Sequence, residues 1–450
     1  MDLSCVRVIS ALRSGSSNRP QSQRRKVLPS LPDVLPSKPG PSKREFVALV
    51  ALMISVVAMS IDTMLPALGQ LGRDLGVEHA NDTQLVITVL FLGLAAAQLV
   101  FGPVSDNIGR RKAIFLGLAL FIVGSALAVV ATSFTVMLVA RFLQGVGAAG
   151  PRIVAVAMVR DRFGGRAMAQ VMSLIMTVFI LVPALAPAIG QGLLLVAHWR
   201  FIFVLLLVQA VVIWVWFGLR QPETLAPASR LPFSLRRVAR AMGETVRTRV
   251  SIGYTIASGL VFGAFLGYLN SAQQIFQDQY DVGSAFPFYF GVLALAVGGA
   301  TVLNSRLVMR FGMQRLARAG VTSAAALSVG FVGLSFAHAG NPPLWMLMAY
   351  LGVDFFCIGI LFGNFNAMAM EPLGHIAGTA AAVISSLATL ISLTLGALIG
   401  RAFDGTVMPL AYGFAGLLVT SAGVMLWTES GATQRPNHGE ETPAPESVRS

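Results

Sequence analysis

Long apolar runs separated by short polar loops constrain this chain more than any other feature of its sequence. Each run has about 20 predominantly apolar residues, the length that a helix needs to cross ~30 Å of hydrocarbon. Backbone N–H and C=O groups find no water in lipid, so each run must be helical. We therefore predict an all-α membrane protein with about twelve transmembrane helices. The runs lie near residues 46–68, 84–104, 113–132, 134–158, 169–195, 201–218, 250–274, 286–305, 318–338, 343–366, 376–400 and 408–428.

The composition also favours a membrane protein. Hydrophobic residues make up 55% of the chain and charged residues 12%, whereas a soluble domain has roughly 25% charged residues. The spacing of the runs predicts two six-helix bundles, with a polar segment between them. The predicted parts are a disordered basic tail at 1–45, a first bundle at 46–218, a linker at 219–249, a second bundle at 250–428 and a polar tail at 429–450.

Most of the 33 Lys and Arg residues lie in alternate loops and in the tails. Cytoplasmic loops of membrane proteins are enriched in these residues, so we predict that both termini and the linker are cytoplasmic. The formal net charge of +13 is spread over short loops and tails rather than gathered in one patch. The lipid bilayer is therefore the expected partner, and nucleic acid is not.

Two similar turns suggest an internal repeat. Residues 106–112 follow the second run and residues 309–315 follow the eighth, and both are basic turns centred on a glycine, Gly109 or Gly312. Transporters are commonly built from repeated halves, with the substrate site between them near the middle of the membrane. Any short cytoplasmic loop needs glycine and arginine, so coincidence stays an alternative.

The first of these turns carries the most specific pattern, formed by Gly102, Asp106, Gly109, Arg110 and Arg111. Gly109 permits a tight turn, and Asp106 can accept hydrogen bonds from arginines or helix N-termini. The pattern resembles the signature loop of the major facilitator superfamily. This resemblance implies the major facilitator fold and a gating loop that latches the two halves in an outward-facing state. A simple positively charged loop is the alternative.

Two opposite charges lie inside apolar runs of the first half, Asp62 in 46–68 and Arg141 in 134–158. A charge in a spanning segment costs at least ~2.5–3.5 kcal/mol, so it normally faces the protein interior and has a role. Both lie at about 10 Å depth from the outer helix ends and could pair. The sequence around Arg141 resembles a motif of proton-coupled facilitators, which implies proton coupling. A structural ion pair is the alternative.

Five polar residues are candidates for the wall of a substrate cavity. Arg152 lies about three turns after the first arginine, on the same helix face. It either neutralises an anionic substrate or extends its side chain towards the cytoplasm. Asp354 is an acid well inside a span, where an ion pair is its alternative role. Tyr268, Asn270 and Asn364 lie in second-half spans, and hydrogen bonds between helices are their alternative role.

A proline-rich stretch in the fifth run resembles the antiporter motif of drug exporters. Pro183, Pro187 and Gly190 match the motif, while Ala186 and Gln191 replace two of its glycines. The prolines are expected to bend the helix. The two replacements leave the direction of transport open.

Segments 61–68, 159–163, 198–200 and 374–380 resemble the bicyclomycin and chloramphenicol resistance exporters, which are drug:proton antiporters. The resemblance implies proton-coupled export of small drug-like or amphiphilic compounds by alternating access. It also implies a monomer in the bacterial inner membrane. Proton-coupled import of a small metabolite on the same fold is the alternative.

The sequence has no HExxH motif, no cluster of Cys and His, and no phosphate-binding loop ending in GKS or GKT. We expect no metal, no cofactor and no catalytic residues, and hence no enzyme. A membrane-integral enzyme or a receptor is the remaining class, and the first of these would need a catalytic cluster. The expected partners are a small-molecule substrate, protons and the bilayer.

Overall fold

The computed structural model describes residues 41–430, and every element in that range is helical. The predicted tails at 1–45 and 429–450 lie almost entirely outside these residues. The long helices are α1 (Lys43–Asp62), α3 (Leu85–Ile108), α4 (Arg110–Val129), α5 (Phe134–Arg162), α6 (Gly165–Val196), α7 (Arg200–Arg220), α9 (Arg249–Gln273), α10 (Phe286–Phe311), α11 (Met313–Ala337), α12 (Leu344–Met370), α13 (Ala377–Arg401) and α14 (Met408–Ser430).

Eleven apolar helical stretches in the range 41–430 are long enough to cross a membrane. One of them, Leu344–Arg401, has 58 residues and consists of α12 and α13 joined by the 3-10 turn η7 (Glu371–Ile376). Ten single stretches and this double one give about twelve spans of the length that hydrocarbon requires. The predicted fold class is confirmed.

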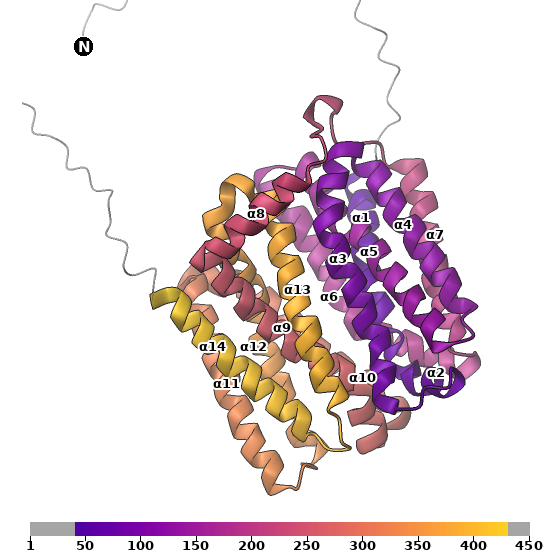
Figure 1. Ribbon diagram of the computed structural model, residues 1–450, viewed down its shortest axis with the longest axis vertical. Helices are drawn as coiled ribbons and strands as arrows, with labels where there is room; N and C mark the ends of the chain where they lie inside the picture. Colours follow the sequence, from indigo (N-terminus) through magenta and orange to yellow (C-terminus); the bar gives the residue numbers. More distant parts are fainter. Residues whose placement is uncertain (1–40, 431–450) are drawn as a thin grey trace, which may run out of the picture. The chain divides into compact units, whose positions relative to one another are not determined.

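The long helices form two bundles that lie side by side (Figure 1). In the first bundle α5 packs against α3 and α4, while α1 packs against α6 and α7. In the second bundle α9 packs against α13 and α14, and α12 packs against α10 and α11. The bundles meet along two helix pairs, α3 with α13 and α6 with α10.

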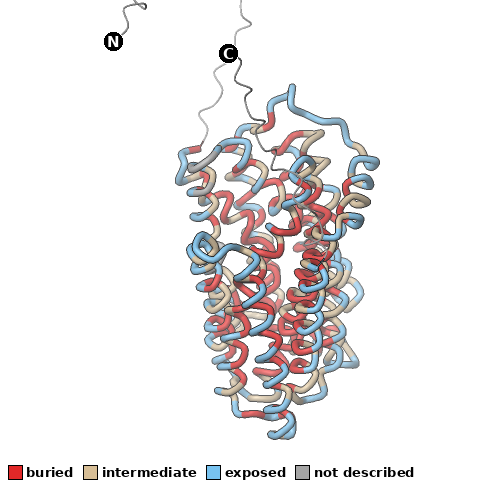
Figure 2. Tube along the Cα trace, turned by 90° about the vertical axis from the view of Figure 1, so that its left-hand side faces the viewer, coloured by how far each residue is buried: buried red, intermediate tan, exposed pale blue. Residues whose placement is uncertain are grey.

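The surface of the bundles has the character that lipid requires. Figure 2 shows buried positions concentrated in the interior and exposed positions on the outward helix faces. Large apolar side chains are exposed in the middle of helices, for example Val123 at 56%, Val215 at 51% and Val329 at 54%. Exposed apolar patches of this extent mark contact with a membrane or a partner.

The two glycine turns share one backbone conformation. Gly109 has φ 96° and ψ 154°, and Gly312 has φ 80° and ψ 154°. Each glycine connects two spans directly, α3 to α4 and α10 to α11. A positive φ disfavours residues with a Cβ, so glycine is needed at both places. The two turns are therefore alike in backbone conformation and in their place within each bundle, and we call the end that carries both turns the basic end.

The predicted linker at 219–249 contains a helix that the sequence analysis did not predict, α8 (Leu235–Arg247). The Ser234 side chain accepts a hydrogen bond from the Arg237 backbone N–H and caps this helix. Helix α8 packs against α9 and α13, and His375 Nε2 lies 2.7 Å from Glu244 Oε1. The linker is thus attached to the second bundle at the basic end.

Candidate functional site

Asp62 is the last residue of α1 and lies in the interior of the first bundle. It is 5% exposed, and none of the described residues forms a hydrogen bond or an ion pair with its carboxyl group. Helix α1 ends here because Pro66 follows in the 3-10 turn η2 (Leu65–Ala67), and proline cannot continue the hydrogen-bond ladder. The short helix α2 (Leu68–Asp74) then resumes the first span. The carboxyl group therefore stands at a break in that span.

Arg141 is fully buried on α5 and is held by neutral oxygen atoms. Its Nη2 donates to the Ser60 backbone oxygen at 2.8 Å, and its Nε donates to the Val86 backbone oxygen at 3.0 Å. Its Nη1 donates to Gln144 Oε1 at 2.7 Å. The predicted ion pair between Asp62 and Arg141 is not formed in this structure. The carbonyl groups at the end of α1 lack helical partners and are partially negative, so they attract the guanidinium.

Gly190 of α6 lies directly beside this break in α1. A Cβ at position 190 would stand 1.9 Å from the Thr63 backbone oxygen, so only glycine allows α6 to approach so closely. Pro183 and Pro187 lie inside the same helix. The antiporter-like stretch thus packs against the residue that follows Asp62, which the sequence alone did not indicate.

Tyr268 of α9 faces the first bundle's acid across the interface. Its hydroxyl group is buried without a hydrogen-bond partner among the described residues, and the charge of Asp62 acts on it electrostatically. Asn270 is also fully buried, and its amide group has no hydrogen-bond partner among the described residues. Its Cβ packs directly against Gly400 of α13, which has no side chain to prevent this approach. Of these two candidates for the cavity wall, Tyr268 lies close enough to Asp62 to interact with it electrostatically. Asn270 lies in the contact between α9 and α13 instead.

The other three candidates for the cavity wall differ in burial, since Asn364 and Asp354 are buried and Arg152 is exposed. Asn364 exchanges two hydrogen bonds with Asn304, at 3.0 and 3.2 Å, and so joins α12 to α10. Asp354 is 0% exposed, and both of its oxygens lack a partner in the described part of the chain. Neither residue lines an open cavity in this structure, because both lie within the second bundle. Arg152 is exposed, and no described residue pairs with it.

The loop around Gly109 is tied to its own bundle and to the linker. Arg110 donates to Asp106 Oδ1 at 2.6 Å and to Asp161 Oδ2 at 3.0 Å. The Glu223 carboxylate accepts from the backbone N–H groups of Arg110 and Arg111, at 2.9 and 3.1 Å. These contacts stabilise the positive N-terminus of α4. The cross-bundle latch that the resemblance implied is not engaged in this structure.

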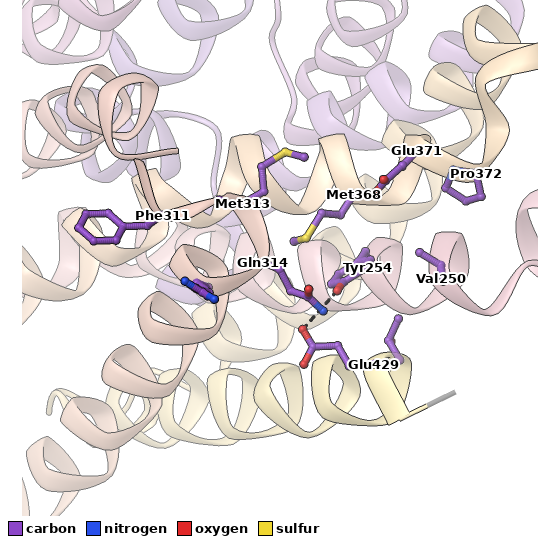
Figure 3. A pocket seen from close by; sticks show the side chains of 12 residues that line it. Val250, Tyr254, Phe311, Met313, Gln314, Met368, Glu371, Pro372 and Glu429 are labelled. Carbon is purple, nitrogen blue, oxygen red and sulfur yellow. Dashed lines mark hydrogen bonds between the residues drawn. The ribbon is translucent and has the colours of Figure 1, made fainter. Parts of the chain in front are cut away.

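The corresponding place in the second bundle is a pocket of about 540 Å³ beside the Gly312 turn. Met313 stands there where the first bundle has Arg110. Figure 3 shows Gln314 beside Tyr254 and Glu429. The Tyr254 hydroxyl group donates a hydrogen bond to Glu429 Oε1 at 3.4 Å. Among the described residues the second turn has no counterpart of the pairs that Arg110 makes, although Glu429 forms an ion pair with Arg318 nearby.

A set of contacts that the sequence analysis missed joins the bundles at the outer end, opposite to the basic end. It centres on Asn81 of the 3-10 turn η3 (Ala80–Gln84), whose Nδ2 donates to the backbone oxygens of Arg401 and Phe403, at 3.0 and 2.9 Å. Gln274 Nε2 donates to Asn81 Oδ1 at 2.6 Å. Asp82 and Arg401 form an ion pair at 2.9 Å.

In the middle of the spans, Ser386 Oγ of α13 donates to the Ala95 backbone oxygen of α3 at 2.8 Å. At the basic end, no hydrogen bond or ion pair joins the helices of the two bundles directly within the described residues, and the linker contacts both bundles.

Comparisons with known proteins agree with this architecture. The family model of the Major Facilitator Superfamily matches residues 50–397. The bicyclomycin resistance protein homolog of Haemophilus influenzae is 28% identical over 392 residues, covering 84% of this chain and 94% of the relative. Multidrug resistance protein D of Escherichia coli is 28% identical over 388 residues, covering 84% and 93%. The solved D-xylose-proton symporter shares the fold with a TM-score of 0.65 at 14% identity, covering 85% of this chain and 96% of that one.

Proposed function

Since this chain belongs to the major facilitator superfamily, and is thus a multi-pass membrane transporter rather than an enzyme, we propose that it exports small drug-like or amphiphilic compounds in exchange for protons. The relatives named for bicyclomycin resistance and multidrug resistance support this substrate class. The proposed location is the bacterial inner membrane, with both termini in the cytoplasm and a monomer as the working unit.

The environment of Asp62 is the observation that carries the proposal. Its carboxyl group is nearly buried and has no partner among the described residues. An unpaired carboxylate is costly in a dry site, whereas a neutral carboxyl group is tolerated. Proton binding at Asp62 is therefore linked to whether water reaches it. Arg141 holds the end of α1 through Ser60, and so it positions the acid without neutralising it directly.

Alternating access uses the two ends of the space between the bundles in turn. The contacts of Asn81 and the ion pair between Asp82 and Arg401 close the outer end. At the basic end, among the residues at 41–430, the two bundles are connected through the linker rather than by direct hydrogen bonds or ion pairs between their helices. This asymmetry favours a state in which the basic end is the one that opens. In the opposite state the outer contacts would separate and the Gly109 loop would latch onto the second bundle.

The direction of transport tests this proposal in inside-out membrane vesicles that contain the full chain. A panel of growth inhibitors that includes bicyclomycin first identifies the compounds to which expression confers resistance. In vesicles with an acidic interior, those compounds should accumulate inside, and a protonophore should abolish the accumulation. Transport in the same direction as protons would instead indicate the import alternative. The absence of flux for every compound of the panel would contradict a drug exporter.

A further inference from the structure

Arg152 is a cation in the middle of the molecule that the proposed proton pathway does not use. It lies ten residues before the end of α5, or about 15 Å from the basic end. Its side chain is exposed, and no described residue forms a hydrogen bond or an ion pair with it. An intramembrane charge normally pairs with a partner or faces a water-filled cavity. Since this arginine has no partner, it must face water or a ligand.

The direction of this side chain follows from its neighbours on α5. Arg152 and Arg141 are about three turns apart and share one helix face. From that face Arg141 reaches Ser60 of α1 and Val86 of α3. A different face, at Gly147 and Pro151, contacts α4. The two arginines therefore leave α5 on the side that lies between α1 and α3.

The gap between α1 and α3 opens towards the second bundle. Helix α3 packs against α13, and the 3-10 turn η2 that follows α1 packs against α9. A side chain that leaves α5 between these elements points into the space between the bundles, not into lipid. The distance to the basic end also exceeds the length of an arginine side chain, which disfavours the alternative that Arg152 extends to the cytoplasmic surface.

The wall of the second bundle is aromatic over depths of about 12 to 24 Å from the basic end. Phe262 and Phe265 of α9 and Phe362 of α12 are partly exposed. Their ring centroids are 5.2 to 6.3 Å apart, and Phe262 also contacts Phe91 of α3 at 5.9 Å. Phe362 lies eight residues before the basic end of its helix, a depth of about 12 Å. The unpaired guanidinium thus lies within the range of depth that the partly exposed rings cover on the second bundle.

We infer that Arg152 binds the acidic group of the substrate, so that this transporter recognises amphiphilic organic anions with an aromatic or apolar body. The inference rests on the proposed transport function and adds the charge of its substrate. A guanidinium forms two parallel hydrogen bonds with a carboxylate, which fixes the orientation as well as the affinity. The apolar body then lies against the rings of Phe262, Phe265 and Phe362. Organic cations are disfavoured, because the exposed group that the first bundle presents here is the unpaired guanidinium of Arg152.

Binding of a matched pair of probes to the full chain in lipid nanodiscs tests the inference. Naphthylacetate carries a carboxylate, and naphthylacetamide has the same shape without the charge. Wild type should bind the acid more tightly than the amide. Since R152Q removes the hydrogen bonds between two charged groups, it should weaken binding of the acid by about tenfold or more. Binding of the amide should change by less than about twofold.

Two further variants make the result specific. R152K keeps the positive charge and should retain part of the preference for the acid over the amide. If R152Q simply failed to fold, it would lose binding of both probes rather than of the acid alone. R160Q removes an exposed arginine about two turns further along α5 and should change neither affinity. Any of three results would overturn the inference. The first is equal affinity of wild type for the two probes, the second is no binding of the acid by wild type, and the third is an equal weakening of the binding of both probes by R152Q.

The same preparations separate this inference from the proposed function. D62N should abolish transport that a pH gradient drives, and it should leave naphthylacetate binding intact. If proton-driven export is present but R152Q has no selective effect, only the recognition of anions is rejected. If R152Q acts selectively but no gradient drives transport, anion binding stands and proton-coupled export is rejected.

Discussion

Arg141 donates a hydrogen bond to the backbone oxygen of Ser60 at 2.8 Å, two residues before Asp62, and not to the carboxyl group of Asp62 itself. The arginine therefore acts on the end of α1 as a cap for its free carbonyl groups. Since Nε of the same side chain binds Val86, one guanidinium joins α1, α3 and α5. The carboxyl group of Asp62 is left without a hydrogen bond or an ion pair among the described residues.

Replacement of Arg141 should destabilise the first bundle. R141M keeps the side chain long but removes the donors to the Ser60 backbone oxygen and to Gln144 Oε1, at a cost of about 1–3 kcal/mol for each buried group left unpaired. We expect a lower midpoint of thermal unfolding in detergent, followed by intrinsic fluorescence. R160M, at an exposed position of the same helix, should unfold like the wild type. Equal midpoints for both variants would show that these hydrogen bonds do not support the fold.

Close packing at Gly190 should be essential for activity. In G190A the new Cβ would meet the Thr63 backbone oxygen at 1.9 Å, so α6 must move away from the break that holds Asp62. We expect loss of transport together with reduced stability, of the order of 1–3 kcal/mol for an overpacked site. G192A, where nothing lies within 4 Å of the new atom, is the matched control and should transport normally. Full activity of G190A would contradict the close approach of α6 to the end of α1.

The hydrogen bonds of Asn81 should hold the outer end closed. N81A removes three of them, each contributing about 0.5–1.5 kcal/mol. We expect the distribution of distances between spin labels on α3 and α13, at the outer end, to shift towards longer values. N107A removes one hydrogen bond to Leu231 at the basic end and should leave that distribution unchanged. A distribution for N81A that matches those of N107A and wild type would show that Asn81 does not hold the outer end.

The two glycine turns should respond differently to alanine. Both have a positive φ, so G312A should cost roughly 1–2 kcal/mol from backbone strain alone. In G109A the added Cβ would also stand 2.4 Å from Glu223 Oε2 and disturb the carboxylate that caps α4. Thermal unfolding should therefore place G109A below G312A, and only G109A should impair transport. The reverse order would mean that the network around Arg110 has no special role.

The sequence was sufficient for the spans, the glycine turns and the intramembrane charges, because these depend on residue type and spacing alone. It could not predict that Arg141 binds carbonyl oxygens, since every residue carries one. Nor could it predict the contacts of Asn81, whose partner Arg401 is 320 residues away. The helix α8 was missed because a polar segment was interpreted as a linker. Its signal was the capping residue Ser234, which precedes a stretch without proline or a helix-breaking pair.

The most direct test of the central claim compares D62N with wild type in the same inside-out vesicles, using a compound to which expression confers resistance. Two quantities are measured, accumulation driven by an imposed pH gradient and exchange of labelled for unlabelled compound without a gradient. If Asp62 carries the proton, D62N loses the accumulation but keeps the exchange, because the neutral amide permits the conformational change without proton transfer. Accumulation by D62N at the wild-type level, with equal amounts of protein in the membrane, would contradict the account.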